Sequence, residues 1–198
     1  MKKGQNFNHP EKGAKIKVDP IRLLKDIKAI KKLLSDKPRD LALFTIGINT
    51  NLRASDLLGL KVGQARGIKP MGEIEVREKK TGKLRRITLN KSCIEVIQGL
   101  LASKAYQDED YLFQSQRGDV LTVPSINRLV KEWCGDINLK GSYGSHTLRK
   151  TWGYHQRVTF GAGLPELMEC FNHSTQKQTL GYLCIQPEEI RSVYANQL

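Results

Sequence analysis

The sequence predicts a mostly α-helical domain with a small antiparallel β-sheet, an α+β class. Over most of the chain, apolar residues recur at the three- and four-residue spacing of amphipathic helices. In residues 72–89 the apolar residues instead alternate, and a Lys-Thr-Gly turn divides that stretch into two strands. A length of 198 residues suits one domain, or one domain with a terminal arm.

The N-terminal part of the chain changes character near residue 19. Residues 1–18 are polar, basic and without apolar periodicity, so we expect a flexible basic arm ahead of a folded domain over residues 19–198. Asp19 is expected to cap the first helix, with Pro20 in its first turn. The pattern then predicts helices over residues 20–35, 38–49 and 53–60.

The strands and the later helices follow from the same rules. Residues 73–77 and 84–89 are expected to pair through a turn at residues 79–82, and a short strand is expected at residues 111–113. Asn90 is a suitable cap for the helix after the hairpin. The remaining helices are expected over residues 90–101, 123–133, 146–158, 164–171, 175–182 and 187–198.

The chain is strongly basic. Lys and Arg number 33 against 20 Asp and Glu, which gives a net charge of +13 and a pI near 9.7. Residues 1–35 hold ten basic side chains and three acidic ones, and a second basic cluster spans residues 77–91. A basic surface kept for solubility is one explanation. Clustered Lys and Arg favour a nucleic-acid partner, because neutralised phosphates release their counterions.

The cysteines and the apolar runs exclude several classes. Cys93, Cys134, Cys170 and Cys184 form no C-x-x-C pair, so we expect neither a metal site nor a redox motif. Their apolar surroundings predict buried free thiols. No apolar run approaches the ~20 residues that span a bilayer, and the N-terminus has no apolar signal segment. We therefore expect a cytoplasmic protein with no membrane partner.

Six residues form the candidate catalytic set: Arg53, Lys80, His146, Arg149, His173 and Tyr182. Arginine holds two phosphate oxygens at once, and a nearby tyrosine can attack the phosphorus. His146 and Arg149 lie three residues apart at a helix start that Ser145 can cap, and a helix N-terminus attracts phosphate. Asp56, three residues after Arg53, is expected to orient that arginine.

Each candidate also has an ordinary structural interpretation when taken alone. Lys80 has the neighbourhood of an exposed hairpin lysine, and Lys79 and Lys83 are rivals for its role. A histidine at a helix corner and a tyrosine at a helix end are usually structural. Tyr194 is an alternative nucleophile, although its distance from the last histidine of the set differs from that of Tyr182.

Taken in order, the local frames are similar to the catalytic domain of the tyrosine recombinases, the lambda-integrase and Xer-type family. The frames are Asn-Leu-Arg53-Ala-Ser-Asp56, Lys80-Thr-Gly, Ser-His146-Thr-Leu-Arg149-Lys and Phe-Asn-His173-Ser-Thr, with Tyr182 nine residues after His173. The resemblance spans about residues 36–186 and departs at Asn172, where the family usually has glycine. Most members carry a separate core-binding domain. With about 50 residues before Arg53, this chain resembles the small stand-alone recombinases.

The resemblance implies the tyrosine-recombinase catalytic fold and a role for each residue. Tyr182 is the nucleophile, Arg53 and Arg149 neutralise the phosphate, and His173 donates a hydrogen bond to it. Asp56 supports the first arginine. The implied product is a 3′-phosphotyrosine, which a 5′-hydroxyl resolves without any metal or nucleotide cofactor.

The resemblance also implies proton-transfer roles and a DNA surface. Lys80 is the candidate acid for the leaving 5′-oxygen, and His146 is the base or proton shuttle. The basic residues near the site are candidate DNA contacts: Lys79, Lys83, Arg85, Arg86 and Lys150.

The expected function is site-specific DNA recombination or integration on double-stranded DNA by a homo-tetramer. Packing of the C-terminal helix, residues 187–198, on its own domain is one alternative, and exchange with a neighbouring protomer is our hypothesis. Two alternative functions remain: a catalytically silent DNA-binding protein of this fold, and a type IB topoisomerase that nicks and reseals one duplex. An accessory protein also stays open as a partner.

Overall fold

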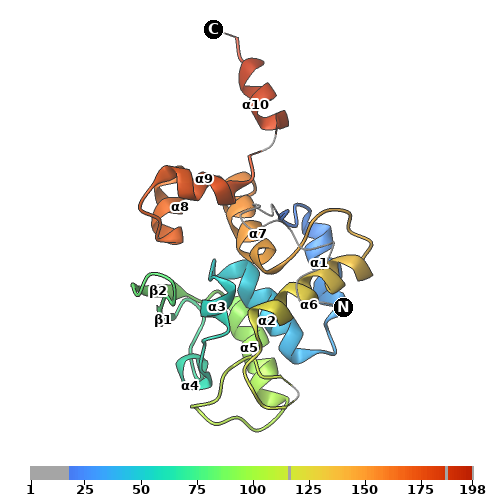
Figure 1. The fold of residues 1–198 in the computed structure, drawn as a ribbon, viewed down its shortest axis with the longest axis vertical. Coiled ribbons are helices and arrows are strands. Elements are labelled where there is room, and N and C mark those ends of the chain that lie inside the picture. Colours follow the sequence, from blue (N-terminus) through green and yellow to red (C-terminus); the bar gives the residue numbers. More distant parts are fainter. Residues whose placement is uncertain (1–17, 116, 186, 198) are drawn as a thin grey trace, which may run out of the picture.

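The computed structural model describes residues 18–115, 117–185 and 187–197, and in this part of the chain it is mostly helical with one small sheet (Figure 1). The predicted class is confirmed. The elements in chain order are α1 (Leu24–Leu33), α2 (Pro38–Asn49), α3 (Ala54–Leu57), α4 (Val62–Ala65), β1 (Glu73–Arg77), β2 (Leu84–Thr88), α5 (Lys91–Ala102), α6 (Val123–Asp136), α7 (Ser145–Val158), α8 (Leu164–Phe171), α9 (Gln176–Leu183) and α10 (Pro187–Tyr194).

Helix α2 is the centre of the main hydrophobic core. It lies between α5 and α7 (Figure 1), and every residue from Ala42 to Ile48 is buried. Phe44 meets Trp133 of α6 edge to face, with ring centroids 5.9 Å apart. A Cβ on Gly47 would lie 2.6 Å from Cδ1 of Leu148, so the absent side chain lets α2 and α7 approach closely.

Strands β1 and β2 form an antiparallel hairpin beside this core. Ile74 pairs with Ile87, and both point inward together with Val76. The turn between the strands is closed by a hydrogen bond of 2.8 Å from the N–H of Gly82 to the carbonyl of Glu78. Gly82 has φ +70°, a left-handed conformation that glycine adopts without steric cost.

The first helix begins later than predicted, at Leu24, so the prediction of an Asp19 cap is wrong. The carboxylate of Asp19 instead accepts from the N–H of Ser142 at 3.0 Å. The N–H of Ile21 donates to Oγ1 of Thr151 at 2.9 Å, and the Ile21 side chain is fully buried. These tertiary contacts hold residues 18–23 against α7 and the loop before it, and they replace the first turn of a helix.

Two further predictions need correction. The expected strand at residues 111–113 is reduced to a single bridge between Lys61 and Tyr111, where the lysine Nζ lies 3.5 Å from the tyrosine ring centroid. Burial of the cysteines is confirmed for Cys93 and Cys134 and is wrong for Cys170, which is exposed, while Cys184 is only partly buried.

Helices α8 and α9 form a small second hydrophobic cluster on the outer side of α7. Leu167, Phe171 and Leu183 are buried in it, and Trp152 and Tyr182 are partly buried against them. This cluster is separate from the main core. The part of the chain that carries His173 and Tyr182 therefore has apolar packing of its own.

Helix α10 projects away from the rest of the molecule and buries none of its described residues (Figure 1). Its start is held by Arg157 of α7, whose Nη2 donates to Oε1 of Glu189 at 2.9 Å and to the carbonyl of Leu183 at 3.1 Å. Residues 1–17 of the predicted arm lie outside the described residues. No helix within the described ranges is long and apolar enough to cross a membrane.

Candidate active site

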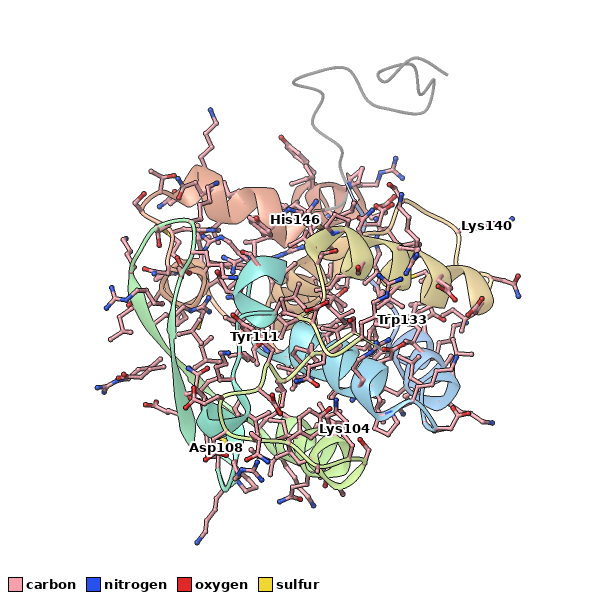
Figure 2. All side chains as sticks on the ribbon, turned by 60° about the horizontal axis from the view of Figure 1, so that its bottom comes forward. Lys104, Asp108, Tyr111, Trp133, Lys140 and His146 are labelled. Carbon is pink, nitrogen blue, oxygen red and sulfur yellow. The ribbon has the colours of Figure 1, made fainter. Side chains whose placement is uncertain are left out.

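The start of α7 presents His146 and Arg149 on one face. The predicted cap is displaced by one residue, because Gly144 occupies the N-cap position and Ser145 is the first helical residue. The N–H of Gly144 donates to Oγ1 of Thr147 at 3.0 Å, and its carbonyl accepts from the N–H of Thr147 at 2.9 Å. In Figure 2, His146 lies on the opposite side of the molecule from Lys104 and Asp108.

Arg149 is almost completely buried, with 1% of its surface exposed. Its guanidinium donates to the carbonyl of Asn51, to the carbonyl of Phe171 at 3.0 Å and to Nε2 of His173 at 3.4 Å. Burial, followed by the neighbouring charge of Arg53, lowers the pKa of Arg149. Because arginine keeps its proton, this shift indicates that an anion entering the site would be strongly favoured.

Arg53 lies at the N-cap of α3 and is held by two acidic residues. Its Nη1 is 2.8 Å from Oε1 of Glu78 and 3.8 Å from Oδ2 of Asp56. Both carboxylates are buried. Asp56 therefore lies as expected for a residue that orients Arg53, and Glu78 joins it as a second partner.

Glu78 is a site residue that the sequence-based prediction missed, although the sequence contains a signal for it. Ile74 and Val76 point inward from β1, and the two-residue period of a strand places residue 78 on the same side. An acidic residue at an inward position requires a buried cationic partner.

His173 follows α8 directly after Asn172, which ends the helix in the left-handed conformation with φ +54°. Asparagine is among the non-glycine residues that tolerate this conformation best, so it can stand where glycine is usual. Nε2 of His173 must accept from Arg149, which only donates, so Nδ1–H donates to Oγ1 of Thr179 at 3.1 Å. Desolvation, then the charges of Arg149 and Arg53, lower the pKa of His173 to about 4, so the ring is neutral at pH 7.

The ring of Tyr182 lies among the side chains of His146, Arg149 and His173 of its own chain. Its ring centroid is 5.2 Å from that of Phe171, 5.4 Å from that of His173 and 6.3 Å from that of His146. The guanidinium carbon of Arg149 lies 5.1 Å from the ring centroid. Tyr194, the alternative nucleophile, is 85% exposed on α10.

Lys80 lies at the exposed tip of the hairpin turn, as do its rivals Lys79 and Lys83. Desolvation lowers the pKa of His146, and the charges of Arg149, Lys150, Arg53 and Lys80 act in the same direction. The backbone N–H of Lys79 donates to Oδ1 of Asp56 at 2.9 Å, which fixes the start of the turn.

The other predicted DNA contacts have different surroundings. Arg86 is exposed and pairs with Glu75 at 3.1 Å. Nζ of Lys150 donates to the carbonyl of Val18 at 2.9 Å. The guanidinium of Arg85 contacts the carbonyls of Asn51 and Cys170 and the carboxylate of Glu78, so it links the hairpin to the segments around the site, and its contact with DNA stays a prediction.

No group of three or more His, Cys, Asp or Glu side chains in the described ranges could hold a metal ion. The site instead consists of cationic and aromatic side chains that converge from α3, the hairpin, α7, α8 and α9. Such an arrangement can hold a phosphate and bring a tyrosine oxygen to it.

The family model described as "Phage integrase family" matches residues 22–189 of this chain. The chain belongs to the phage integrase family. A curated relative, the probable integrase/recombinase YoeC of Bacillus subtilis (strain 168), is 34% identical over 181 residues, which cover 89% of this chain and 95% of YoeC. Tyrosine recombinase XerC of Caldanaerobacter subterraneus subsp. tengcongensis is 28% identical over 81% of this chain and 47% of XerC.

Solved structures of integrase-family proteins share the fold of this chain. XerA recombinase superposes with a TM-score of 0.74 at 20% identity, over 96% of this chain and 66% of XerA. A lambda integrase fragment bound to a core site superposes with a TM-score of 0.64 at 18% identity, over 90% of this chain and 64% of the fragment. The predicted fold is confirmed. The chain spans about half to two thirds of the length of XerC, XerA and the lambda integrase fragment, and nearly all of YoeC.

Proposed function

We propose that this chain is a site-specific DNA recombinase that breaks and rejoins DNA through a 3′-phosphotyrosine. One observation carries the proposal: Tyr182 packs among Arg149, His146 and His173 of its own chain, with Arg53 acting on the same group. Membership of the phage integrase family supports it. Two structural relatives, XerH bound to a difH substrate and lambda integrase bound to a core site, are named as DNA complexes.

The scissile phosphate would bind between the two catalytic arginines. Arg53 and Arg149 would neutralise its non-bridging oxygens as charge builds in the transition state, the effect that usually contributes most. A bound phosphate would also favour a second proton on His173, which would then donate from Nε2 to the same phosphate.

The proton transfers follow from the charge states of the histidines. His146, whose pKa is lowered, is neutral at pH 7 and can take the proton from the Tyr182 hydroxyl. The tyrosine oxygen forms the new bond to phosphorus, and the bond from phosphorus to the 5′-oxygen breaks. Lys80 would give the leaving oxygen a proton.

Assembly on DNA would use α10. Ile190, Val193 and Tyr194 are 51%, 64% and 85% exposed, so the apolar face of this helix is uncovered on its own domain. We propose that α10 docks on a neighbouring protomer in a tetramer on double-stranded DNA, in the cytoplasm where the DNA is accessible. A chain of residues 1–185 that assembles on DNA as well as the full-length chain would refute this part of the proposal.

The test of the function is covalent capture on a nicked suicide substrate. Wild-type protein should form a protein–DNA adduct, and Tyr182→Phe should abolish it. Tyr194→Phe, which removes the hydroxyl of the alternative nucleophile but keeps the apolar ring on α10, should retain it. DNA binding without an adduct in the wild type would point to a silent DNA-binding protein. Relaxation of one plasmid without exchange between two would point to the topoisomerase alternative.

A further inference from the structure

Glu78, the second acidic partner of Arg53, also lies at the base of the hairpin turn that carries Lys80. Its side chain is completely buried. Oε2 accepts from the Thr81 hydroxyl at 2.7 Å, and Oε1 lies 2.8 Å from Nη1 of Arg53 and 3.7 Å from Nη1 of Arg85.

Glu78 is ionised despite its burial. Burial alone would raise its pKa, but the hydrogen bonds from Thr81 and Arg53 and the charges of Arg53 and Arg85 together lower it. An unpaired carboxylate is costly in such surroundings, so the charge is retained only because these partners surround it.

The turn that presents Lys80 is anchored on both sides of the lysine. Before it, the N–H of Lys79 donates to Asp56, and after it the Thr81 hydroxyl donates to Glu78. The two carboxylates that receive these bonds are also the two that face Arg53. The phosphate-binding arginine and the turn therefore share the same anchors.

We propose that Glu78 is a positioning residue that sets Lys80 and Arg53 relative to each other, one carboxylate oxygen serving the turn and the other serving the arginine. The proposal rests on the proposed strand-cleavage function. Glutamine has the same shape but no charge, so in either orientation of its amide it loses the ion pair with Arg53 and the charge-assisted hydrogen bond from Thr81.

The test measures adduct formation on nicked substrates with two leaving groups. One substrate has the ordinary 5′-oxygen, and the other has a bridging 5′-sulfur, which departs as a thiolate without needing a proton. Lys80→Ala defines the pattern for loss of the acid: slow on oxygen and restored on sulfur.

We expect Glu78→Gln to slow cleavage of the oxygen substrate by about ten-fold or more, a partial loss of the ~10²–10⁴-fold that general acid catalysis usually contributes. The sulfur substrate should restore part of the rate, because the Arg53 defect remains. Thr81→Val, on the exposed turn, leaves the Arg53–Glu78 pair intact and should be restored almost fully by sulfur. Glu75→Gln, which removes an exposed carboxylate from the same hairpin, should match the wild type on both substrates.

Equal slowing of Glu78→Gln on both substrates, or wild-type rates on both, would overturn the proposal. Amide hydrogen exchange supplies a readout that needs no cleavage. The Lys79 and Gly82 amides, which close the turn, should exchange faster in Glu78→Gln and in Thr81→Val than in Glu75→Gln. Unchanged exchange would also overturn the positioning role, whereas absence of any wild-type adduct would count against the proposed function instead.

Discussion

The protonation of His173 links the architecture of the site to the stability of the whole protein. Its ring is desolvated and faces Arg149 and Arg53, which together lower its pKa to about 4. The unfolded chain binds the same proton near pH ~6.5. The folded protein binds this proton at a lower pH than the unfolded chain does. The stabilising contribution of the neutral His173 ring is therefore fully present above pH ~6.5 and is lost as the pH falls toward 4.

The size of the effect follows from that interval. A shift from ~6.5 to about 4 corresponds to roughly 3 kcal/mol in full and roughly 2 kcal/mol at pH 5. Because the ring is only half-buried, solvent screening reduces the expected loss between pH 8 and pH 5 to about 1–2 kcal/mol.

Urea unfolding at pH 8 and pH 5 measures this loss when wild type is compared with His173→Gln. The wild type should lose about 1–2 kcal/mol more than the variant over the interval, since both share every other titrating group. Histidine-ring NMR of the intact protein gives the pKa of His173 directly. A value near 6.5 in the folded protein would refute the reasoning.

NMR measurement of the pKa of His173 also separates the effect of burial on that pKa from the effect of the neighbouring charges. Arg53→Gln removes one positive neighbour and should raise the pKa of His173, and so should a bound DNA phosphate. DNA binding should therefore take up protons and strengthen as the solution is acidified from pH 8 to pH 6. Identical pKa values for His173 in the wild type and in Arg53→Gln would leave desolvation and the charge of Arg149 as the causes.

Three further changes probe the packing and the thiols. Phe171→Ala should lower the free energy of unfolding by about 3–5 kcal/mol, because the ring is fully buried; a loss below about 1 kcal/mol by urea titration would contradict this. Gly153→Ala should also destabilise, because the new Cβ would lie 2.8 Å from Cζ of Phe171; the same titration would instead show a gain of up to about 1 kcal/mol if helix propensity dominated. In the folded protein, alkylation mapped by mass spectrometry should modify exposed Cys170 well before Cys93 and Cys134, whose burial raises their pKa values to about 11 and about 12.

Periodicity and turn chemistry were sufficient for the parts of the fold held by local patterns. The hairpin was predictable because Ile74, Val76 and Ile87 alternate around a Lys-Thr-Gly turn. The start of α1 was not, because the carboxylate of Asp19 is taken by Ser142, more than a hundred residues away in sequence. The sequence around Asp19 does not show that a distant backbone amide binds its carboxylate.

The charged residues divide in the same way. Arg53 and Arg149 stand in recognisable local frames, whereas the engagement of Arg85 by the carbonyls of Asn51 and Cys170 depends on segments that meet only in the folded chain. Arg85 therefore resembled a DNA-contacting residue in the sequence. An acidic residue in a basic stretch is typical of surface charge, and only the position of Glu78 two residues after the inward-facing Val76 indicates that it is buried.

Arg149 shows why catalysis and folding are difficult to separate at this site. Its guanidinium binds the carbonyl of Asn51, beside the main core, and the carbonyl of Phe171, in the small cluster that carries Tyr182. Replacing it would remove a proposed phosphate ligand and also the link between these two parts of the molecule. Arg53 forms its ion pairs with Asp56 and Glu78, both on one side of the site. Removing Arg53 would leave both buried carboxylates without this partner and would disturb the turn that they anchor, so a loss of cleavage in either arginine variant must be compared with its free energy of unfolding.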